Sequence, residues 1–276
     1  MSTVTTSDRA ELSGWASYAR DLWSRREFAW FLAMGNLKAR NASTTLGLLW
    51  WVVNPLLLAG VYFLVFGLIF GARDGDPAYL GYLLSGMLAF NFTTMSMTGG
   101  ANSILQNSKL LVNIRFPRLI LPVSALVESS FGFLSSLFVY YLIVFPADRV
   151  GPSLWILILV PVVAVHILFN LGLAALMARL AVPFRDIGNL IPHLNRLWLY
   201  LSPIIWPLSF IEDKADWVQS ALWLNPMYSF LSLYRTALMG REFDWLAVAV
   251  ALAWTVAIFA LGVISFARYE GNMVRH

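Results

Sequence analysis

The feature that most constrains this chain is a set of long apolar runs without charged residues. Residues 48–70 contain no Asp, Glu, Lys or Arg, and a helix rising about 1.5 Å per residue over that length crosses a hydrocarbon core of roughly 30 Å. Residues 245–267 form a second charge-free run. Hydrophobic residues make up 59% of the chain and charged residues 12%. The sequence therefore predicts an all-α integral membrane protein.

The apolar stretches predict six transmembrane helices, at 48–70, 79–98, 119–145, 152–178, 187–211 and 245–267. The fifth is the least uniform, because Pro203 and Pro207 lie near its end. Proline interrupts backbone hydrogen bonding, so irregular backbone there must be buried in protein or line a wet cavity. We expect this segment to pack inside the protein.

Basic residues predict the orientation. The two termini and the 99–121 and 179–196 loops, which an even number of spans places on one side, hold 14 of the 19 Lys and Arg residues. Such an excess marks the cytoplasmic side. Both termini are thus expected in the cytoplasm: an N-terminal segment (1–47) and a short tail (268–276) flank a membrane domain (48–267).

Two segments outside the spans are amphipathic. Residues 12–23 place apolar side chains on one helical face, which predicts an N-terminal interfacial helix at the membrane surface, continuing through 28–34; the alternative is a soluble helix packed on a partner. Residues 102–116 mix Lys109 and Arg115 with dense apolar residues, which predicts a second short helix on the cytoplasmic surface, ended by Pro117. Its alternative is an interfacial loop without a partner.

The segment 212–244 is apolar and rich in Trp and Tyr between charged ends. It is too short to cross the membrane twice and too apolar to lie in water. We expect an extracellular re-entrant pair of short helices, joined at Asn225 and Pro226.

Several kinds of chemistry are missing from the sequence. It has no phosphate-binding G-x-x-x-x-G-K-[ST] loop, so energy must come from a partner or an ion gradient, and it has no cysteine. Asp74 and Asp76 resemble an acid pair but lie in a Gly/Pro turn, so we assign no metal and no catalytic residue. Buried ionisable residues are too few for a proton-coupled carrier. We expect Glu128 to reach the cytoplasmic interface or pair with Arg179 or Arg185, and His166 to be a hydrogen-bonded packing residue.

Four motifs carry a resemblance to a known family. They are LKARNASTTLGLLWWVVNP (37–55), the NSKLL and FPRLILP runs (107–122), VPFRDIGNL to LSPIIWP (182–207) with the pair Arg185 and Asp186, and LNPM (224–227). In this order they resemble ABC-2 type permeases, in the branch that exports lipid-linked polysaccharides such as O-antigen, teichoic acid or cell-wall galactan. Asn41 departs from the pattern, since an aromatic residue is usual there.

The resemblance implies a homodimer in the bacterial cytoplasmic (inner) membrane, with two ABC ATPase subunits that bind ATP and Mg²⁺. It implies no cofactor in this chain and no nucleic-acid partner. The substrate would be a polysaccharide on a polyprenyl diphosphate, moved from the cytoplasm to the outer face. The 102–116 segment would be the coupling helix that docks on the ATPase, through Asn107, Lys109, Leu110, Leu111, Ile114 and Arg115.

Aromatic residues of the first and fifth spans are candidates for the substrate channel, because sugar C–H faces stack on rings. They are Trp51, Tyr62, Phe63, Phe66, Trp198, Tyr200 and Trp206. The alternative is that these rings form interfacial belts or pack in the core. Competing functions are a small-molecule, drug or lipid exporter of the same superfamily, a membrane enzyme acting on lipid-linked sugars with Asp74 and Asp76 as its acids, and a scaffold without ATPase coupling.

Overall fold

The computed structural model describes residues 17–41, 45–69, 71, 78–114, 116–148, 154–184, 186–211 and 216–273. Within these ranges the chain is helical and contains no strand, which confirms the all-α prediction for the described part. The main helices are α2 (Arg26–Asn41), α3 (Trp50–Tyr62), α5 (Tyr79–Gln106), α6 (Ser108–Asn113), α7 (Ile120–Asp148), α8 (Ile156–Ala181), α9 (Ile187–Leu201), α10 (Asp216–Leu222), α11 (Pro226–Met239) and α12 (Trp245–Met273).

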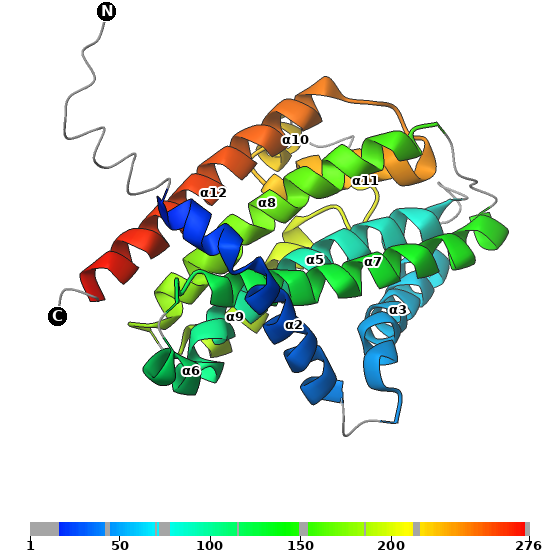
Figure 1. Cartoon of the computed structure of the whole chain (residues 1–276). Coiled ribbons are helices and arrows are strands. Elements are labelled where there is room, and N and C mark those ends of the chain that lie inside the picture. Colours follow the sequence, from blue (N-terminus) through cyan, green and yellow to red (C-terminus); the bar gives the residue numbers. More distant parts are fainter. Residues whose placement is uncertain are drawn as a thin grey trace, which may run out of the picture.

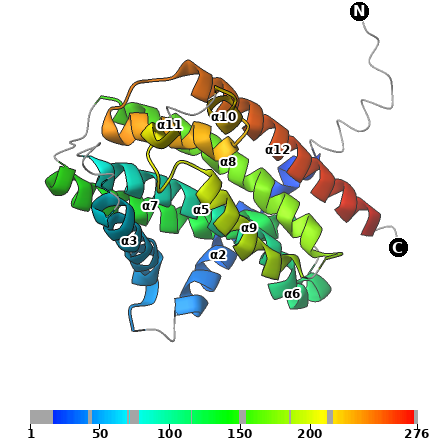
Figure 2. The same ribbon diagram turned by 180° about the vertical axis from the view of Figure 1, so that it is seen from behind.

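Four long helices, α5, α7, α8 and α12, run side by side and form the body of the molecule (Figure 1). Helix α11 packs against α5, α8 and α12. Helices α2 and α3 cross the edge formed by α7, and α9 lies along α5 on the face seen in Figure 2. The α6 helix and the end of α12 lie at one end of this body.

Glycine allows α8 to approach two neighbours closely. A side chain at Gly262 of α12 would overlap the backbone of Gly172, and one at Gly100 of α5 would overlap the backbone of Ala174. Since a backbone cannot move aside as a flexible side chain can, α5, α8 and α12 are held at fixed crossings.

Three described helices are long and apolar enough to cross a membrane: Ile120–Val144, Ile156–Ala181 and Trp245–Glu270. The first predicted span is helical over nearly its whole length: a short turn at Gly47–Leu49 precedes α3, and wider π-helical turns continue it over Phe63–Ile69. Helix α5 has 28 residues, but its polar residues lower its hydropathy. The complete set of six spans stays a prediction.

The fifth predicted span is not one helix. Helix α9 ends at Leu201, and an irregular segment through Pro207 follows, because Pro203 and Pro207 cannot continue helical hydrogen bonding. Ser202, Ile204 and Ile205 are fully or almost fully buried, so the expectation that irregular backbone is enclosed in protein is confirmed. The predicted span 187–211 thus contains α9, the irregular segment and a short helical turn at Leu208–Ile211.

Side chains from α5 and α11 satisfy the carbonyls of this broken segment. The Tyr82 hydroxyl donates to the carbonyl of Pro203 (3.0 Å), and buried Arg235 donates to the same oxygen (2.6 Å). The guanidinium of Arg235 also lies over the Tyr82 ring, 3.4 Å from its centroid. A cation near the carbonyl end of α9 is favoured by the helix dipole, so this buried charge has a structural reason.

The helix pair predicted for 212–244 is confirmed as α10 and α11, joined just before Pro226. Asn225 holds the joint: its side-chain oxygen accepts hydrogen bonds from the Met227 backbone (3.0 Å) and from the Trp198 indole (2.8 Å). Its side-chain nitrogen donates to Ser202 (2.8 Å). The re-entrant, extracellular placement of the pair stays a prediction.

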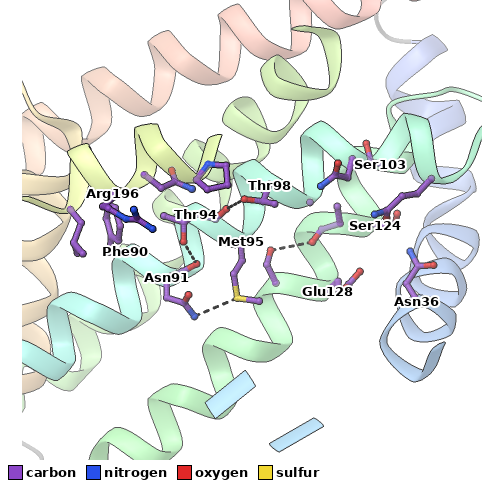
Figure 3. A pocket seen from close by; sticks show the side chains of 18 of the residues that line it. Asn36, Phe90, Asn91, Thr94, Met95, Thr98, Ser103, Ser124, Glu128 and Arg196 are labelled. Carbon is purple, nitrogen blue, oxygen red and sulfur yellow. Dashed lines mark hydrogen bonds between the residues drawn. The ribbon is translucent and has the colours of Figure 1, made fainter. Parts of the chain in front are cut away.

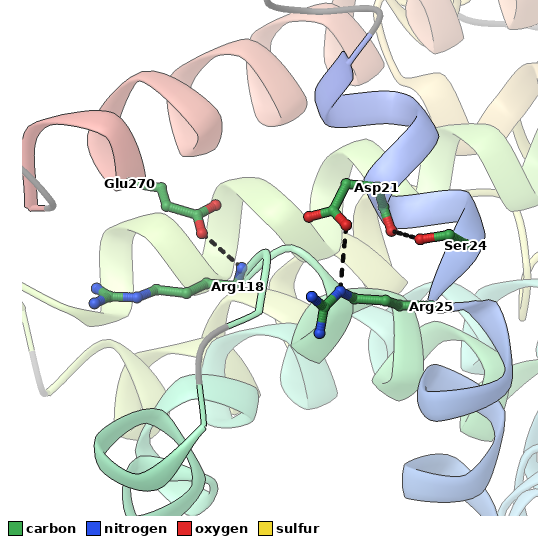
Figure 4. A network of polar contacts seen from close by, with 5 residues as sticks. All are labelled: Asp21, Ser24, Arg25, Arg118 and Glu270. Carbon is green, nitrogen blue, oxygen red and sulfur yellow. Dashed lines mark hydrogen bonds and ion pairs between the residues drawn. The ribbon is translucent and has the colours of Figure 1, made fainter.

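The ends of the described chain meet beside the start of α7 (Figure 4). Glu270 of α12 accepts hydrogen bonds from the Arg118 backbone N–H and from the Tyr18 hydroxyl, both at 2.7 Å. Burial, together with the adjacent Glu270 carboxylate, raises the pKa of Tyr18, so the phenol stays a donor. Residues 17–24 are helical and Tyr18 and Leu22 pack on a small apolar cluster at this end.

Candidate functional site

The candidate site is built from one polar face of α5. Asn91, Thr94, Thr98 and Asn102 recur at intervals of three or four residues, so they share one side of the helix. They line a cavity of about 710 Å³. A volume of this size is typical of ligand-binding cavities.

Four other helices complete the cavity (Figure 3). Helix α2 contributes Asn36, α3 contributes Tyr62, α7 contributes Ser124 and Glu128, and α9 contributes Asn195 and Arg196; these and the α5 residues are the main polar groups. The lining is therefore mixed: amide and hydroxyl groups alternate with apolar side chains, such as Phe90 and Met95 of α5 and Leu199 of α9.

The charges in the described lining are one acid and one base, Glu128 and Arg196. Glu128 is 7% exposed. The predicted pairing of Glu128 with Arg185 lies outside the described residues, and Arg179 places its guanidinium over the Tyr269 ring, 4.1 Å from the centroid. The structure thus places Glu128 in a cavity wall, a location that the sequence did not predict.

The predicted aromatic channel residues are only partly brought together. Tyr62 lines the cavity, and it interacts with the exposed side chain of Tyr200. The other described rings have packing contacts: Phe63 stacks on Tyr79, Phe66 lies beside Tyr62, Trp198 packs edge-on against Phe90, and the Trp206 indole donates to the Tyr200 carbonyl. The side chain of Trp51 lies outside the part of the chain that the structure describes.

The predicted coupling segment has different helix boundaries from those expected. Residues 102–106 belong to the end of α5, Asn107 interrupts the helix, and α6 contains six residues. Leu110 and Leu111 of α6 are half-buried, and Ile114, the residue that follows it, is 47% exposed, so this segment presents apolar side chains on the surface. The side chain of Lys109 and all of Arg115 lie outside the described part.

His166 is the hydrogen-bonded packing residue that the sequence predicted. Its two ring nitrogens lie 2.7 Å from the Thr93 hydroxyl and 3.0 Å from the Tyr234 hydroxyl, and Phe230 stacks on the ring. Asp186 lies exposed at the start of α9, whereas Arg185, Asp74 and Asp76 are outside the described ranges. Among the described residues no group of His, Asp and Glu could hold a metal ion.

Sequence reasoning missed the polar face of α5. A signal was available, because Asn91, Thr94, Thr98 and Asn102 lie at helical spacing in an otherwise apolar span. Singly, each residue is neutral and easily accepted in a membrane helix. Their alignment, together with Glu128 and Arg196 from helices distant in sequence, becomes apparent only in the folded chain.

Comparisons with known proteins agree with these observations. A family model described as "ABC-2 type transporter" matches residues 28–239. The O-antigen export system permease protein RfbA of Myxococcus xanthus is 31% identical over 246 residues, which cover 86% of this chain and 93% of the relative. A protein of the same name from Klebsiella pneumoniae is 25% identical over 238 residues, covering 85% of this chain and 90% of the relative.

Proposed function

Because the chain belongs to the ABC-2 type transporter family, we propose that it is the membrane permease of an ABC exporter for a lipid-linked polysaccharide. The substrate would be a polymer such as O-antigen, teichoic acid or galactan on a polyprenyl diphosphate, moved from the cytoplasm to the outer face of the bacterial inner membrane. Support for this substrate class comes from the relatives' names, which describe O-antigen export.

The observation that carries the proposal is the polar cavity among α2, α3, α5, α7 and α9. Apolar helices have no structural need for a cavity lined by amides and hydroxyls, since exposed polar groups are costly in lipid. A glycan offers hydroxyl groups to such a lining and C–H faces to nearby rings. The cavity is therefore suited to a sugar chain passing between α5 and its neighbours.

The ATPase docking site is proposed at α6 and the residue that follows it. Ile114 is 47% exposed and Leu110 and Leu111 are half-buried, and exposed apolar anchors usually supply most of an interface's binding energy. Glu270 binds the backbone of Arg118, just after this segment. Movement of α6 would thus be passed to α7 and α12.

The assembly and topology follow from the same proposal. Two copies of this chain would associate with two ATPase subunits, which would bind ATP and Mg²⁺. Six membrane crossings would place both termini and α6 in the cytoplasm, and α10 with α11 on the outer side. The distribution of basic residues supports this orientation.

A small-molecule, drug or lipid exporter is the second candidate. The cavity volume of about 710 Å³ would also hold a single small ligand. The two candidates differ in their cellular readout, because loss of a polysaccharide exporter removes surface polymer, whereas loss of a drug exporter lowers drug resistance.

The test of the cavity is the double substitution Thr94→Leu with Thr98→Leu, which fills it with apolar side chains. We expect surface polysaccharide to be lost from cells whose only copy carries this change, while membrane insertion and ATPase copurification persist. Ser135→Leu is the matched control, because Ser135 is exposed on α7 and absent from the cavity lining. Normal export by the double variant would rule out the cavity as the path.

The docking site needs a separate test. Leu111→Asp should abolish copurification of the ATPase, because a buried carboxylate in an apolar interface costs several kcal/mol, about three orders of magnitude in affinity. Ser108→Asp is the control on the exposed side of the same helix. An unchanged complex after Leu111→Asp combined with Ile114→Asp would contradict docking at α6.

A further inference from the structure

The cavity ends where α5 meets the broken segment that follows α9. Its α5 lining runs from Met87 to Gln106, roughly 30 Å along the helix. Beyond Met87 the helix is covered, since a methyl group on Gly86 would lie 3.2 Å from the side chain of Ile204 and 3.5 Å from its backbone. Leu199 of α9 lines the cavity, and the coil after α9 passes between α5 and α11 (Figure 2). Residues 202–207, which we call the end segment, therefore lie at one end of the cavity.

Side chains of α5 and α11 hold the end segment through its carbonyl groups. In a continuous helix the backbone N–H of residue 207 would donate to the carbonyl of Pro203, but Pro207 has no N–H. The Tyr82 hydroxyl (3.0 Å) and Arg235 (2.6 Å) donate to that oxygen instead. Two further hydroxyl-to-carbonyl bonds join α5 to this segment, from Tyr79 to Ile205 and from Tyr82 to Trp206. The end segment is thus fixed by side chains of neighbouring helices.

Arg235 is a buried charge at this contact. It is 5% exposed, and within the described ranges no acid lies at ion-pair distance from it. Its guanidinium lies over the Tyr82 ring, and its Nε has no hydrogen-bond partner among the described residues. The carbonyl end of α9 offsets part of the cost of burying the charge, but an apolar side chain would fill the same space at lower cost. The charge therefore favours a role beyond packing.

Contacts of this kind can be exchanged for water. Phenol, guanidinium and carbonyl groups all form hydrogen bonds with water, so the net stabilisation from each bond is small. The end segment can therefore separate from α5 and α11 without leaving its polar groups unpaired. Because the end segment continues directly from α9, a shift of α9 would be passed to it.

Resting on the proposed export function, we infer that the end segment closes the outer end of the cavity and that Tyr82 and Arg235 are positioning residues that hold it closed. Breaking their bonds to Pro203 releases the segment and connects the cavity with the outer side, where the polymer leaves. Neither residue belongs to the described cavity lining. They act through the end segment and not by touching the polymer.

A structural alternative is that these contacts only satisfy the carbonyls of a proline-broken helix. That role predicts a loss of stability when the contacts are removed, without a change in access to the cavity from outside. Access from the outer side is therefore the readout that separates closure from capping.

The experiment uses the absence of native cysteine. Thr94→Cys places a thiol of similar size in the cavity wall, and Ser220→Cys places one on the exposed surface of α10. Intact cells that carry the full chain and its ATPase are treated with a membrane-impermeant maleimide, and a permeant maleimide then measures the thiols that remain. The rate of labelling from outside is compared with and without Tyr82→Phe or Arg235→Gln.

Tyr82→Phe keeps the ring but removes the hydroxyl, and Arg235→Gln ends two bonds short of the nitrogen that reaches Pro203. Each change should raise the labelling of Thr94→Cys from outside about tenfold, the ratio expected from one or two net hydrogen bonds. Unchanged labelling in both variants, with Ser220→Cys still labelled, would overturn the inference and leave the export function in place. A Ser220→Cys chain that does not react from outside would overturn the proposed orientation, and both proposals with it.

Thr236→Val is the matched control on α11. Among the described residues the Thr236 hydroxyl bonds to the carbonyls of Ser232 and Glu242 and not to the end segment. The variant thus removes a buried hydrogen bond next to Arg235 without freeing that segment. Labelling of Thr94→Cys from outside should stay within about twofold of that in the unchanged background. An increase as large as that in Arg235→Gln would show that any loosening of α11 opens the cavity, and would overturn the inference.

Discussion

The two sides of α5 differ sharply in packing. On one side, α8 lies against α5 and α12 through glycine contacts at Gly100, Gly172 and Gly262, and His166 is completely buried. On the other side, α3 and α9 border a cavity of about 710 Å³. Exposed leucines follow both helices at helical spacing, at Leu57, Leu64, Leu190, Leu194, Leu197 and Leu201.

This difference in packing indicates that the two sides of α5 have different roles. Backbone-to-backbone contacts permit few alternative arrangements, so the α5, α8 and α12 side can serve as a fixed frame. The side formed by α3 and α9 has fewer buried contacts, and elements that move are drawn from such regions. In this account, substrate passes along the movable side while the frame keeps its geometry.

The largest expected effect is at the glycine crossing of the frame. Gly262→Ala places a methyl group against the backbone of Gly172, and we expect a loss of about 3 kcal/mol or more in unfolding free energy, seen as aggregation or a large fall in melting temperature in detergent. Gly60→Ala in α3 meets no atom within 4 Å and should change stability by less than about 1 kcal/mol. Similar results for the two variants would remove the distinction between the sides.

A smaller effect is expected at the buried histidine of the frame. His166→Ala leaves Thr93 and Tyr234 without their shared partner and opens a cavity, which should cost about 2–4 kcal/mol. Tyr234→Phe removes one hydrogen bond and should cost about 1 kcal/mol. Thermal denaturation of both variants in one detergent compares their losses of stability. A His166→Ala variant as stable as the unchanged protein would show that the frame does not depend on this buried contact.

The smallest effect is expected where the ends of the chain meet. Tyr18→Phe removes a hydrogen bond to Glu270 and should lower stability by about 1 kcal/mol or less. Glu270→Gln keeps an acceptor for the Arg118 N–H but removes the negative charge at the start of α7. The loss of stability in Glu270→Gln should be similar to that in Tyr18→Phe and should become smaller as salt is added. A large loss of stability would mean that this contact belongs to the frame.

The sequence predicted those features that depend on local chemistry. Proline at positions 203 and 207 predicted enclosed irregular backbone, and Asn225 followed by Pro226 predicted the joint of a helix pair, because Pro suits the first turn of a helix and Asn caps it. Both predictions are confirmed. His166 was likewise predicted as a hydrogen-bonded packing residue.

Features that depend on distant contacts were not predictable from the sequence. Glu128 was expected to reach the cytoplasmic interface or to pair with Arg179 or Arg185; that it lines a cavity could not be predicted, because this depends on how both α7 and α9 pack on α5. The aromatic rings were chosen because they lie in the first and fifth predicted spans, whereas their contacts depend on the direction in which each side chain points: Trp198 donates to Asn225 and Phe63 stacks on Tyr79. The break at Asn107 depends on where α5 ends and separates residues 102–106 from α6.

Locking each side in turn and measuring export separates a fixed frame from a movable side. Tyr62→Cys with Tyr200→Cys, two interacting residues of α3 and α9, would be joined by a short reducible thiol cross-linker. Trp155→Cys with Phe243→Cys, whose rings stack at 5.8 Å next to α8 and α12, is the matched pair on the frame. We predict that cross-linking Tyr62→Cys to Tyr200→Cys stops appearance of surface polysaccharide until reductant is added, while the frame pair exports normally. Undiminished export with the α3 and α9 pair fully cross-linked would show that export does not require movement between these helices.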